Sequence, residues 1–348
     1  MSEGLDRENS SPARDGFAMP AEWDAHLRTW MCWPCRTEAW GGPEAMLRAK
    51  QAYARVARAI STFEPVVMAV RPHDYAEAKL ACAGRVEFFE APLDDSWSRD
   101  MGPTFLLGAG GARAGVQWQF NAWGNKYRPY DSDAEFATRV LRHQDVPVYY
   151  APFICEGGAI HVDGEGTLIA TEQCLLNPNR NPGLTQQQVE QGVALFTGAR
   201  KVIWLGDGFS DEETDGHVDN IACFVAPGRV LIGVPPRAHP DYGPVMEAIR
   251  RLKDTRDAQG RALEIIEMAQ PQKLAGDWRG RPLAASYINF YLPTGGVVMP
   301  AFDDPNDEAA RGVLADCFPG RDILQIDAVD IVQGGGGIHC ITQQEPAS

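Results

Sequence analysis

The segment Gly334-Gly335-Gly336-Gly337-Ile338-His339-Cys340-Ile341-Thr342 lies close to the end of the 348-residue chain. Glycine accepts backbone angles that other residues avoid, and it lets another group come close to the main chain. The β-branched residues at both ends of 338–342 predict a short strand, which would present the Cys340 thiol at the floor of a pocket. Taken alone, the segment is equally compatible with an inert cysteine in a flexible tail, because cysteine is among the most buried residue types.

Similar opening segments recur near residues 100, 160, 217, 288 and 338. Each is polar or rich in glycine and leads into a hairpin pattern, then a helical pattern, then a strand pattern. A spacing of roughly 50 to 70 residues is typical of an array or propeller of like units. We therefore expect an α/β fold in which the opening segments meet at a common axis. The alternative is an ordinary α/β domain with scattered hairpins.

The secondary structure expected from this pattern can be given by residue range. Hydrophobic periodicity predicts an amphipathic helix over 43–63, and the sequence predicts further helices over 74–83, 132–143, 185–196, 242–252 and 308–317. Short apolar runs predict strands at 65–70, 86–89, 146–150, 202–205, 263–268 and 323–326. Alternation around glycine-containing turns predicts hairpins over 104–120, 160–171, 221–234 and 286–300.

Composition limits the partners and the location. The formal net charge of −15 would repel nucleic acid and anionic membrane surfaces, whereas it is compatible with a cationic small molecule. The sequence contains no apolar run long enough for a transmembrane helix, and residues 1–17 lack the apolar core of a signal peptide. The eight scattered cysteines suit a reducing compartment. We expect a cytoplasmic protein with a mobile tail over 1–16 and one catalytic domain over 17–348; whether it forms a homo-oligomer is left open.

Cys32-Trp33-Pro34-Cys35 has the spacing of a redox pair. Such a pair would follow a strand and open a helix. A zinc site would need a second pair of cysteines, and the sequence has none at a suitable spacing. We interpret the spacing as incidental and keep a redox protein that uses Cys32 and Cys35 as an alternative.

A nucleophilic thiol at Cys340 needs a base or a cation nearby, because an ordinary cysteine is only a few per cent thiolate at neutral pH. His339 is adjacent, but neighbours on a strand point to opposite faces, so the partner should come from elsewhere. His161 and His217 both stand in His-Val-Asp motifs, and on a strand His217 and Asp219 would share one face. We disfavour a metal site here, since thiolate hydrolysis needs no metal and no third histidine follows the pattern.

Asp100, Glu156 and Asp219 would add three carboxylates around that thiol. Clustered anions raise a thiol pKa and are costly to bury. The cost falls when the ligand is a cation, and a planar guanidinium can pair with two carboxylates in bidentate fashion. Its central carbon would then face the sulfur. These residue types together predict hydrolysis at a guanidinium carbon.

Six motifs, in order along the chain, support this reading with high specificity. They are Ala18-Met19-Pro20-Ala21-Glu22-Trp23, Trp97-Ser98-Arg99-Asp100-Met101-Gly102-Pro103, Glu156-Gly157-Gly158, Asp215-Gly216-His217-Val218-Asp219-Asn220, Ala284-Ala285-Ser286-Tyr287-Ile288-Asn289-Phe290-Tyr291 and Ile338-His339-Cys340-Ile341-Thr342-Gln343-Gln344. Together they resemble the agmatine deiminase family of the guanidino-group-modifying, or pentein, superfamily. The likeness runs from Gly16 to Pro346. It implies a five-bladed α/β-propeller of ββαβ-type units.

The resemblance also implies a role for each matching residue. Cys340 would attack the guanidinium carbon, and His217 would protonate the leaving ammonia and then activate water. Asp100 and Asp219 would hold the guanidinium nitrogens, and Glu156 would orient His217. The products would be N-carbamoylputrescine and ammonia, with no cofactor and no metal, in the synthesis of putrescine and other polyamines.

One position departs from the family pattern. The family more often has Gly-Gly-Asn-Ile-His-Cys, whereas this chain has Gly337 where asparagine is usual. The change removes a hydrogen-bonding side chain beside Cys340. It bears on the rigidity of the loop and on the rate more than on the class of reaction.

The choice of guanidine depends on the far end of the substrate. Arginine ends in an α-carboxylate that needs a cation, whereas agmatine ends in an ammonium. Asp211, Glu212, Glu213 and Asp215 would form an acidic loop that repels the carboxylate and attracts the amine.

Within this loop we expect Glu213 to bind the amine beside Thr214, with Trp97 packing on the alkyl stem. The alternatives are a deiminase of arginine or peptidyl-arginine, which an arginine in the distal pocket would favour, and a guanidine-binding protein without catalysis.

Overall fold

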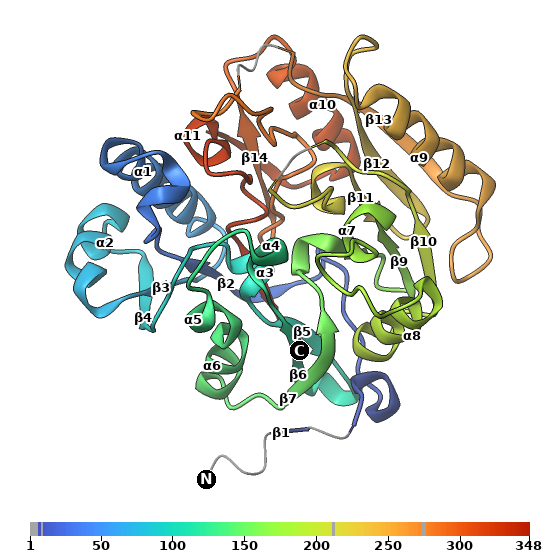
Figure 1. Cartoon of the computed structure of the whole chain (residues 1–348), viewed down its shortest axis with the longest axis horizontal. Coiled ribbons are helices and arrows are strands. Elements are labelled where there is room, and N and C mark those ends of the chain that lie inside the picture. Colours follow the sequence, from blue (N-terminus) through green and yellow to red (C-terminus); the bar gives the residue numbers. More distant parts are fainter. Residues whose placement is uncertain (1–5, 8–9, 211–212, 273–275) are drawn as a thin grey trace.

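The computed structural model describes residues 6–7, 10–210, 213–272 and 276–348. Within these ranges the strands form five separate sheets. Figure 1 shows the sheets arranged around the middle of the molecule, with the longer helices toward the periphery. The α/β class predicted from the sequence is confirmed. Among the described residues, no helix combines the length and apolar character needed to cross a membrane.

The sheets follow one another along the chain, apart from the first, which takes strands from both ends, and the second, which takes β1 from the N-terminal segment. The order of the first sheet is β16-β2-β3-β4, and the others are β1-β7-β6-β5, β10-β9-β8, β11-β12-β13 and β14-β15. The strands are β1 Asp6–Arg7, β2 His26–Cys32, β3 Val66–Val70, β4 Val86–Glu90, β5 Thr104–Leu107, β6 Arg113–Gln119, β7 Val148–Ile154, β8 Ile160–Val162, β9 Thr167–Ala170, β10 Lys201–Trp204, β11 Ala222–Ala226, β12 Arg229–Val234, β13 Glu264–Ala269, β14 Gly296–Ala301, β15 Asp322–Asp327 and β16 Gln343–Pro346.

The helices divide into long peripheral ones and short ones near the middle (Figure 1). The long ones are α1 Pro43–Ile60, α2 Tyr75–Cys82, α6 Phe136–His143, α8 Gln186–Thr197, α9 Tyr242–Asp254 and α10 Asp307–Cys317. The short ones are α3 Ser98–Met101, α4 Ala122–Asn125, α5 Asp131–Ala134, α7 Glu172–Leu175 and α11 Val329–Val332. All six predicted helices are present, with ends that differ by a few residues, and the one predicted over 132–143 is divided into α5 and α6.

The repeating unit is an antiparallel hairpin followed by a helix and a parallel strand. β5 and β6 pair in antiparallel fashion, and after α6 the chain returns as β7, parallel to β6. The same sequence of elements recurs in β8, β9, α8 and β10, and again in β11, β12, α9 and β13. Parallel pairing requires a crossover connection, and each long helix supplies one. The predicted repeat is therefore present in the described residues.

The two ends of the chain are joined in the first sheet. β16 lies antiparallel to β2, with Gln343 opposite Trp30. This pairing anchors the chain three residues after Cys340, because β2 belongs to the core of the first unit. The position of the thiol is therefore fixed by residues more than 300 positions earlier in the sequence.

Several local predictions were wrong. Residues 338–342 form a turn, and the strand begins only at Gln343. Val218–Asn220 is a 3-10 turn, so His217 and Asp219 do not share a strand face. In the hairpin expected over 286–300, Tyr291 makes a single antiparallel bridge to Val298, and β14 pairs along its length with β15. Polar side-chain contacts in these segments replace the ladder bonds that the apolar pattern suggested.

The mobile tail expected over 1–16 also differs from the structure in the part that is described. Asp6 and Arg7 pair in parallel with Val148 and Tyr149. Pro12–Asp15 forms a 3-10 turn whose Asp15 accepts a hydrogen bond from the Tyr149 hydroxyl at 2.6 Å. A polar composition does not exclude an edge strand, since backbone groups alone can extend a sheet.

Glu345 ties the closing strand to its neighbours. Its side chain is fully buried, and its Oε2 accepts a hydrogen bond from Trp30 Nε1 at 2.9 Å. Arg113, on β6 of the next sheet, forms an ion pair with Oε1. The contact thus links two sheets through one carboxylate.

We predict that Glu345→Ala lowers the free energy of unfolding by about 3 kcal/mol, because it leaves the buried indole N–H of Trp30 without its acceptor and the partly buried Arg113 without its carboxylate. Chemical denaturation followed by tryptophan fluorescence measures this loss. The matched control is Arg229→Ala, which removes the partly exposed pair with Glu264 and should cost at most about 1 kcal/mol. Equal effects of the two variants would contradict the assignment.

Candidate active site

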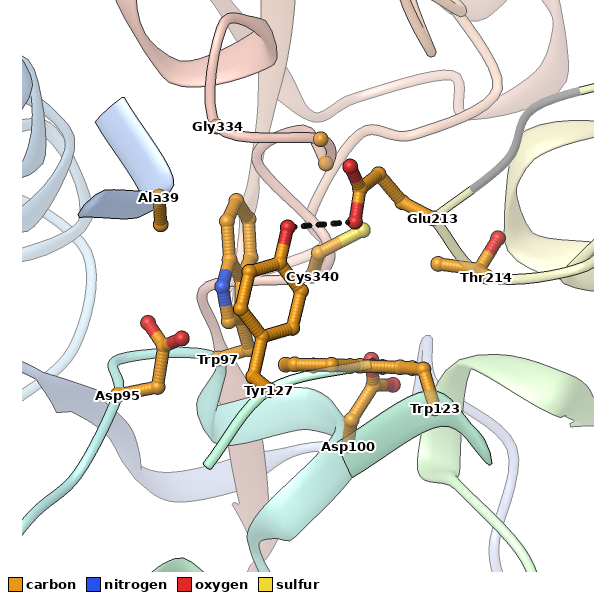
Figure 2. A pocket seen from close by; sticks show the side chains of 12 residues that line it. Ala39, Asp95, Trp97, Asp100, Trp123, Tyr127, Glu213, Thr214, Gly334 and Cys340 are labelled. Carbon is orange, nitrogen blue, oxygen red and sulfur yellow. Dashed lines mark hydrogen bonds between the residues drawn. The ribbon is translucent and has the colours of Figure 1, made fainter. Parts of the chain in front are cut away.

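A narrow pocket opens near the middle of the molecule. It brings together segments that are far apart in sequence, including the glycine run and the segment near residue 100 (Figure 2). Its lining consists of Ala39, Asp95, Trp97, Asp100, Trp123, Tyr127, Glu213, Thr214, Gly334, Gly335, Gly336 and Cys340. Five of the eight predicted site residues are in this lining. The convergence expected from the repeat is therefore observed.

The glycine run gives the pocket its shape because side chains would not fit there. A Cβ on Gly336 would lie 2.6 Å from the Trp97 ring and 3.1 Å from Cys340 Sγ. Gly335 has a φ of +104°, and a Cβ there would lie 2.6 Å from Glu213. The glycines thus let Trp97, Glu213 and the thiol approach the same loop.

Asn289 fixes the cysteine turn. Its Oδ1 accepts hydrogen bonds from the backbone N–H groups of His339 at 2.8 Å and of Cys340 at 3.3 Å. Its Nδ2 lies 3.2 Å from Cys340 Sγ and donates to it. A Cβ on Gly337 would collide with the Asn289 amide oxygen. A side chain at position 337 would therefore need the space that the Asn289 amide occupies in this chain.

The turn also changes the expected direction of His339. His339 Nδ1 lies 2.9 Å from Asp219 Oδ2, and Cys340 Sγ lies 3.5 Å from the same oxygen. The prediction that adjacent His339 and Cys340 point to opposite faces was wrong. In a turn, successive side chains do not alternate as they do on a strand.

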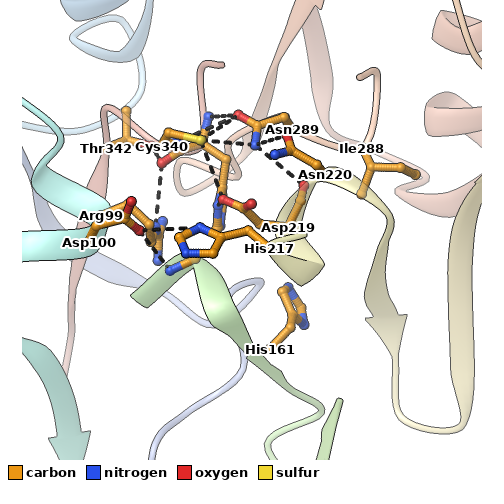
Figure 3. A network of polar contacts seen from close by, with 12 residues as sticks. Arg99, Asp100, His161, His217, Asp219, Asn220, Ile288, Asn289, Cys340 and Thr342 are labelled. Atoms are coloured by element: carbon orange, nitrogen blue, oxygen red, sulfur yellow. Dashed lines mark hydrogen bonds and ion pairs between the residues drawn. The ribbon is translucent and has the colours of Figure 1, made fainter. Parts of the chain in front are cut away.

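The predicted base His217 and two of the predicted acids, Asp100 and Asp219, meet beside the thiol (Figure 3). His217 Nδ1 lies 3.8 Å from Asp100 Oδ1, and His217 Nε2 lies 3.8 Å from Glu156 Oε2. A Cβ on Gly158 would lie within 3 Å of side-chain atoms of His217, Asp100 and Asp219. Glycine at 158 is therefore required for these three side chains to converge.

Short helical turns present these groups. Asp100 lies in α3, and its two oxygens accept hydrogen bonds from Gly158 N at 3.0 Å and from Trp123 Nε1 at 2.8 Å. Glu156 precedes the 3-10 turn Gly157–Ala159, and His217 precedes the turn Val218–Asn220. Each functional side chain thus sits at or beside the start of a short turn.

A buried arginine holds Glu156. Arg180 Nε donates to Glu156 Oε1 at 2.6 Å, and Arg180 NH1 pairs with Asp215 at 2.7 Å. Arg180 lies between two Asn-Pro dipeptides, in a stretch that the sequence pattern marks only as a loop. No sequence pattern indicated that Arg180 contacts the site, and none indicated the site roles of Trp123, Tyr127 and Asn289.

The charges at the site depend on burial and on these contacts. Burial raises the pKa of the Cys340 thiol well above its ordinary value, and the carboxylates of Asp219 and Asp100 raise it further. Burial alone would lower the pKa of His217, but Asp100, Cys174 and Glu156 raise it well above the usual range. The thiol is therefore protonated and His217 is an imidazolium at neutral pH.

The carboxylates differ from one another. Burial raises the pKa of Asp100, and although the charge of His217 opposes this, the net shift is upward. For Glu156 burial is outweighed by Arg180 and His217, so its pKa is lowered. For Asp219 burial is outweighed by His339 and His217, so its pKa is also lowered.

Several polar atoms at the centre have no hydrogen-bond partner within the described part of the chain. All are buried: Glu156 Oε2, both ring nitrogens of His217, and Asp219 Oδ1. Buried polar groups are normally satisfied, so an unsatisfied set calls for an explanation. Together they offer carboxylate acceptors and an imidazolium donor around the thiol.

At the outer end of the pocket, the carboxylate of Glu213 is already engaged. It accepts a hydrogen bond from the Tyr127 hydroxyl at 2.8 Å (Figure 2). It also pairs with Arg279 at 3.2 Å and with Arg281. Two arginines therefore lie beside the side chain that we expected to bind an amine. Asp211 and Glu212, from the same predicted acidic loop, lie outside the described residues.

The other two expected binding residues also line the pocket. Trp97 stacks on Trp40, with ring centroids 5.8 Å apart. The Thr214 hydroxyl accepts a long hydrogen bond from the backbone N–H of His217, at 3.4 Å.

The remaining sequence alternatives lie away from the pocket or lack the right chemistry. His161 lies on β8, where its Nδ1 accepts a hydrogen bond from Phe224 N at 3.3 Å. Burial raises the pKa of the Cys32 and Cys35 thiols well above normal, whereas a redox pair needs a lowered pKa. The pair also leads from β2 into a loop.

A metal site is the other chemistry to consider. Glu156, Cys174 and His217 offer ligand atoms within 4.8 Å of one another among the described residues. These are donor types that zinc accepts. The Arg180 guanidinium, however, lies against Glu156, and its positive charge disfavours a divalent cation at that place.

The fold and this set of side chains define a class of protein. The family of Porphyromonas-type peptidyl-arginine deiminases matches residues 18–346, and the chain belongs to this family. Its relatives include an agmatine deiminase of Pseudomonas syringae pv. tomato, which is 42% identical over 365 residues and covers 97% of this chain and 98% of its own length.

Solved structures agree with this assignment. The agmatine deiminase of Enterococcus faecalis superimposes with a TM-score of 0.93 at 36% identity, covering 97% of this chain and 98% of that one. A Cys-to-Ser variant of the agmatine deiminase of C. jejuni, with substrate bound, gives a TM-score of 0.86 at 26% identity, covering 94% of this chain and 96% of that one.

We predict that Asn289→Asp slows alkylation of Cys340 by iodoacetamide at neutral pH by about tenfold or more, since one pKa unit corresponds to a factor of ten. The variant keeps an oxygen for the two backbone N–H groups but replaces the donor to sulfur by an anion. Peptide mass spectrometry measures the rate at Cys340. Asn306→Asp, which adds the same charge at the start of α10, should leave the rate unchanged.

Proposed function

We propose that this chain hydrolyses agmatine to N-carbamoylputrescine and ammonia, as a step in putrescine and polyamine synthesis. The proposal combines the family membership with the chemistry of the pocket. The agmatine deiminase of Pseudomonas syringae pv. tomato aligns with nearly the whole chain. The pocket is lined by a thiol and carboxylates, and the His217 imidazole lies beside one of these carboxylates. The C. jejuni enzyme has been solved as a Cys-to-Ser variant with substrate bound. Retention of intact substrate by such a variant is expected if the replaced cysteine is the nucleophile of that enzyme.

The observation that carries the proposal is the set of unsatisfied atoms around Cys340. Asp219 Oδ1 and Glu156 Oε2 are buried acceptors without partners among the described residues. A ligand that satisfies them must bring several N–H donors and a positive charge. A guanidinium has both, and its planar fork matches paired carboxylates. Asp100 and Asp219 then hold its nitrogens on either side of the carbon that faces the sulfur.

The reaction starts with substrate binding. The thiol has a raised pKa because it faces Asp219 and Asp100. A guanidinium that pairs with these carboxylates neutralises them, so the thiol releases its proton to solvent when the substrate is bound. The thiolate of Cys340 then adds to the guanidinium carbon, giving a neutral tetrahedral adduct. Binding of the substrate cation therefore promotes formation of the Cys340 thiolate that attacks it.

Ammonia leaves in the next step. The imidazolium of His217 donates a proton to one amino group of the adduct, the carbon–nitrogen bond breaks, and an S-alkylthiouronium remains on Cys340. Neutral His217 then takes a proton from water, and the hydroxide adds to the thiouronium carbon. When the carbon–sulfur bond breaks, Cys340 leaves as a thiolate, and the ureido product loses a proton to solvent. Glu156 holds His217 through both half-reactions.

The same proposal extends to architecture and location. We propose that the five sheets are the blades of a single five-bladed propeller domain over 17–348, supported by the repeated hairpin, helix and parallel strand. A location in the cytosol is supported by eight free cysteines, which fit a reducing compartment.

A second substrate has one specific observation in its favour. Arg279 and Arg281 lie against Glu213 at the outer end of the pocket, where the α-carboxylate of arginine would lie if the guanidinium faces Cys340. Agmatine would instead place its ammonium there, next to Glu213 and the Tyr127 hydroxyl. Neither arginine is among the lining residues, whereas Glu213 is, so agmatine remains the first choice.

We predict that the purified chain releases ammonia from agmatine and forms N-carbamoylputrescine, identified by mass spectrometry, while Cys340→Ser forms none. Arginine is offered separately under the same conditions. Conversion of arginine alone would keep the mechanism and replace the substrate. Binding of agmatine without turnover by the folded wild type would favour a guanidine-binding protein instead.

We predict that Glu213→Gln raises the KM for agmatine by about tenfold or more with little change in kcat, since a hydrogen bond to a charged group contributes about 1.5–3 kcal/mol. Arg281→Ala should lower the KM for agmatine, because it releases Glu213 from a competing cation. Steady-state kinetics measure both. Arg256→Ala, at a surface turn, serves as the control. A rise in the KM for agmatine in Arg281→Ala would contradict the role of Glu213.

A further inference from the structure

Behind the thiol, on the side away from the glycine run, lies a second small set of buried polar groups. A small cavity is bordered there by Glu22, His161, Asp219 and His339, together with apolar side chains. Glu22 comes from the N-terminal segment and His339 from the cysteine turn. Asp219 belongs to both sets, so it connects the cavity to the site of reaction.

His339 lies between two carboxylates. Its Nδ1 is 2.9 Å from Asp219 Oδ2, and its Nε2 is 2.9 Å from Glu22 Oε1 and 3.0 Å from Glu22 Oε2. A neutral imidazole has one donor and one acceptor, so it can donate to only one of two carboxylates. Only the imidazolium donates to both. Since Arg99 also pairs with Glu22 and favours its ionised form, the geometry favours a positive charge on His339.

The main chain and a neighbouring arginine keep this imidazolium in place. Asn289 Oδ1 accepts from the backbone N–H of His339 at 2.8 Å, and Arg99 Nε donates to the His339 carbonyl at 3.4 Å. Arg99 NH1 also pairs with Glu22 Oε1 at 3.2 Å, and its backbone N–H donates to the Cys340 carbonyl at 3.1 Å. The cation is thus fixed to the same turn that carries the nucleophile.

We propose that His339 is a positioning residue for the reaction: held by Glu22, it acts as a permanent buried cation that keeps Asp219 ionised and turns its free oxygen toward the substrate guanidinium. This inference rests on the proposed function for its substrate. Asp219 Oδ2 is engaged by His339, while Asp219 Oδ1 has no partner among the described residues. One oxygen is therefore anchored and the other is left for the ligand.

The proposal assigns Glu22 the role of anchor. Glu22 faces His339, Arg99 and His161, whose Nε2 lies 3.6 Å away. His161 Nδ1 accepts a hydrogen bond from the Phe224 N–H. The proton of the neutral His161 ring is therefore on Nε2, the nitrogen that faces Glu22. A carboxylate with three such donors remains an anion in spite of its burial.

The charged groups around Asp219 set the direction of the pH effect. It faces His339 and His217 as cations, with Arg99 farther off, and it faces Asp100 and the Cys340 thiol on the other side. Burial alone would raise the pKa of Asp219, and His339 is the largest of the effects that lower it. Without that cation the pKa of Asp219 rises, and the carboxylate is protonated at a higher pH.

The first experiment is the pH profile of kcat/KM for agmatine in wild type and in His339→Asn. Asparagine keeps a donor near the Nδ1 position but carries no charge. We expect the acidic limb of the profile to move to higher pH, and KM to rise more than kcat falls at acidic pH, with a loss of about tenfold or more per pKa unit.

His26→Asn is the matched control for loss of a buried histidine. His26 pairs with Glu64 at 3.3 Å and contacts Tyr291, away from the thiol. Its variant should keep the acidic limb of wild type. If His339→Asn also keeps that limb, the hydrogen bond suffices without the charge and the proposal is overturned.

Glu22→Gln provides a second variant should His339→Asn fail to fold. It leaves His339 with a single carboxylate, so the acidic limb should shift in the same direction by a smaller amount. An unchanged limb in a folded Glu22→Gln protein would overturn the role of Glu22 as anchor.

A readout without substrate separates this proposal from the proposed function. At a pH above the acidic limb, where Asp219 is ionised in both proteins, loss of the buried cation should slow alkylation of Cys340 by iodoacetamide, measured by peptide mass spectrometry, because the Asp219 carboxylate that is no longer neutralised raises the pKa of the thiol. If the wild type converts neither agmatine nor arginine, the proposed function fails, yet slower alkylation in His339→Asn than in His26→Asn still supports the buried cation. Equal rates in the two variants would overturn it.

Discussion

Carboxylates buried next to a thiol are the condition on which this structure depends. Asp100, Glu156 and Asp219 are almost completely removed from solvent, and isolated anions in such a place are costly. The fold provides a cation for each region: Arg180 for Glu156, His217 between Glu156 and Asp100, and His339 for Asp219. On the side that faces the thiol, the negative charge of these carboxylates is not fully neutralised by the protein, and a cationic ligand fits there.

The same balance explains why the nucleophile sits in a turn. On a strand, His339 and Cys340 would face opposite ways, whereas in the turn both reach Asp219. The turn is held by Asn289 and is approached closely by the glycine run, because neither Trp97 nor Glu213 would tolerate a side chain there. Glycine therefore supplies shape at this site, and asparagine and histidine supply the polar contacts.

Recognition at the outer end of the pocket follows different rules from recognition at the centre. The centre is closed, buried and built from short helical turns. The outer end is built from loops, where Glu213, Tyr127, Arg279 and Arg281 share one set of contacts. The Glu213 carboxylate is already paired, so a ligand must compete with its present partners in order to bind it. Substrate preference at the outer end therefore depends on which partner the ligand displaces.

The sequence by itself determined the class of fold, the longer helices, the hairpins near residues 104–120, 160–171 and 221–234, and the chemical type of the site. These follow from short-range periodicity and from motifs whose residues lie close together, such as His217 with Asp219. The sequence could not decide that residues 338–342 form a turn, that Asn289 binds the thiol, or that Arg180 and Glu22 hold the acids and histidines. Each of these contacts joins segments that are 24 to 317 positions apart. Polar contacts between distant segments decide the local conformation there, and no local pattern records which partner a buried polar group will find.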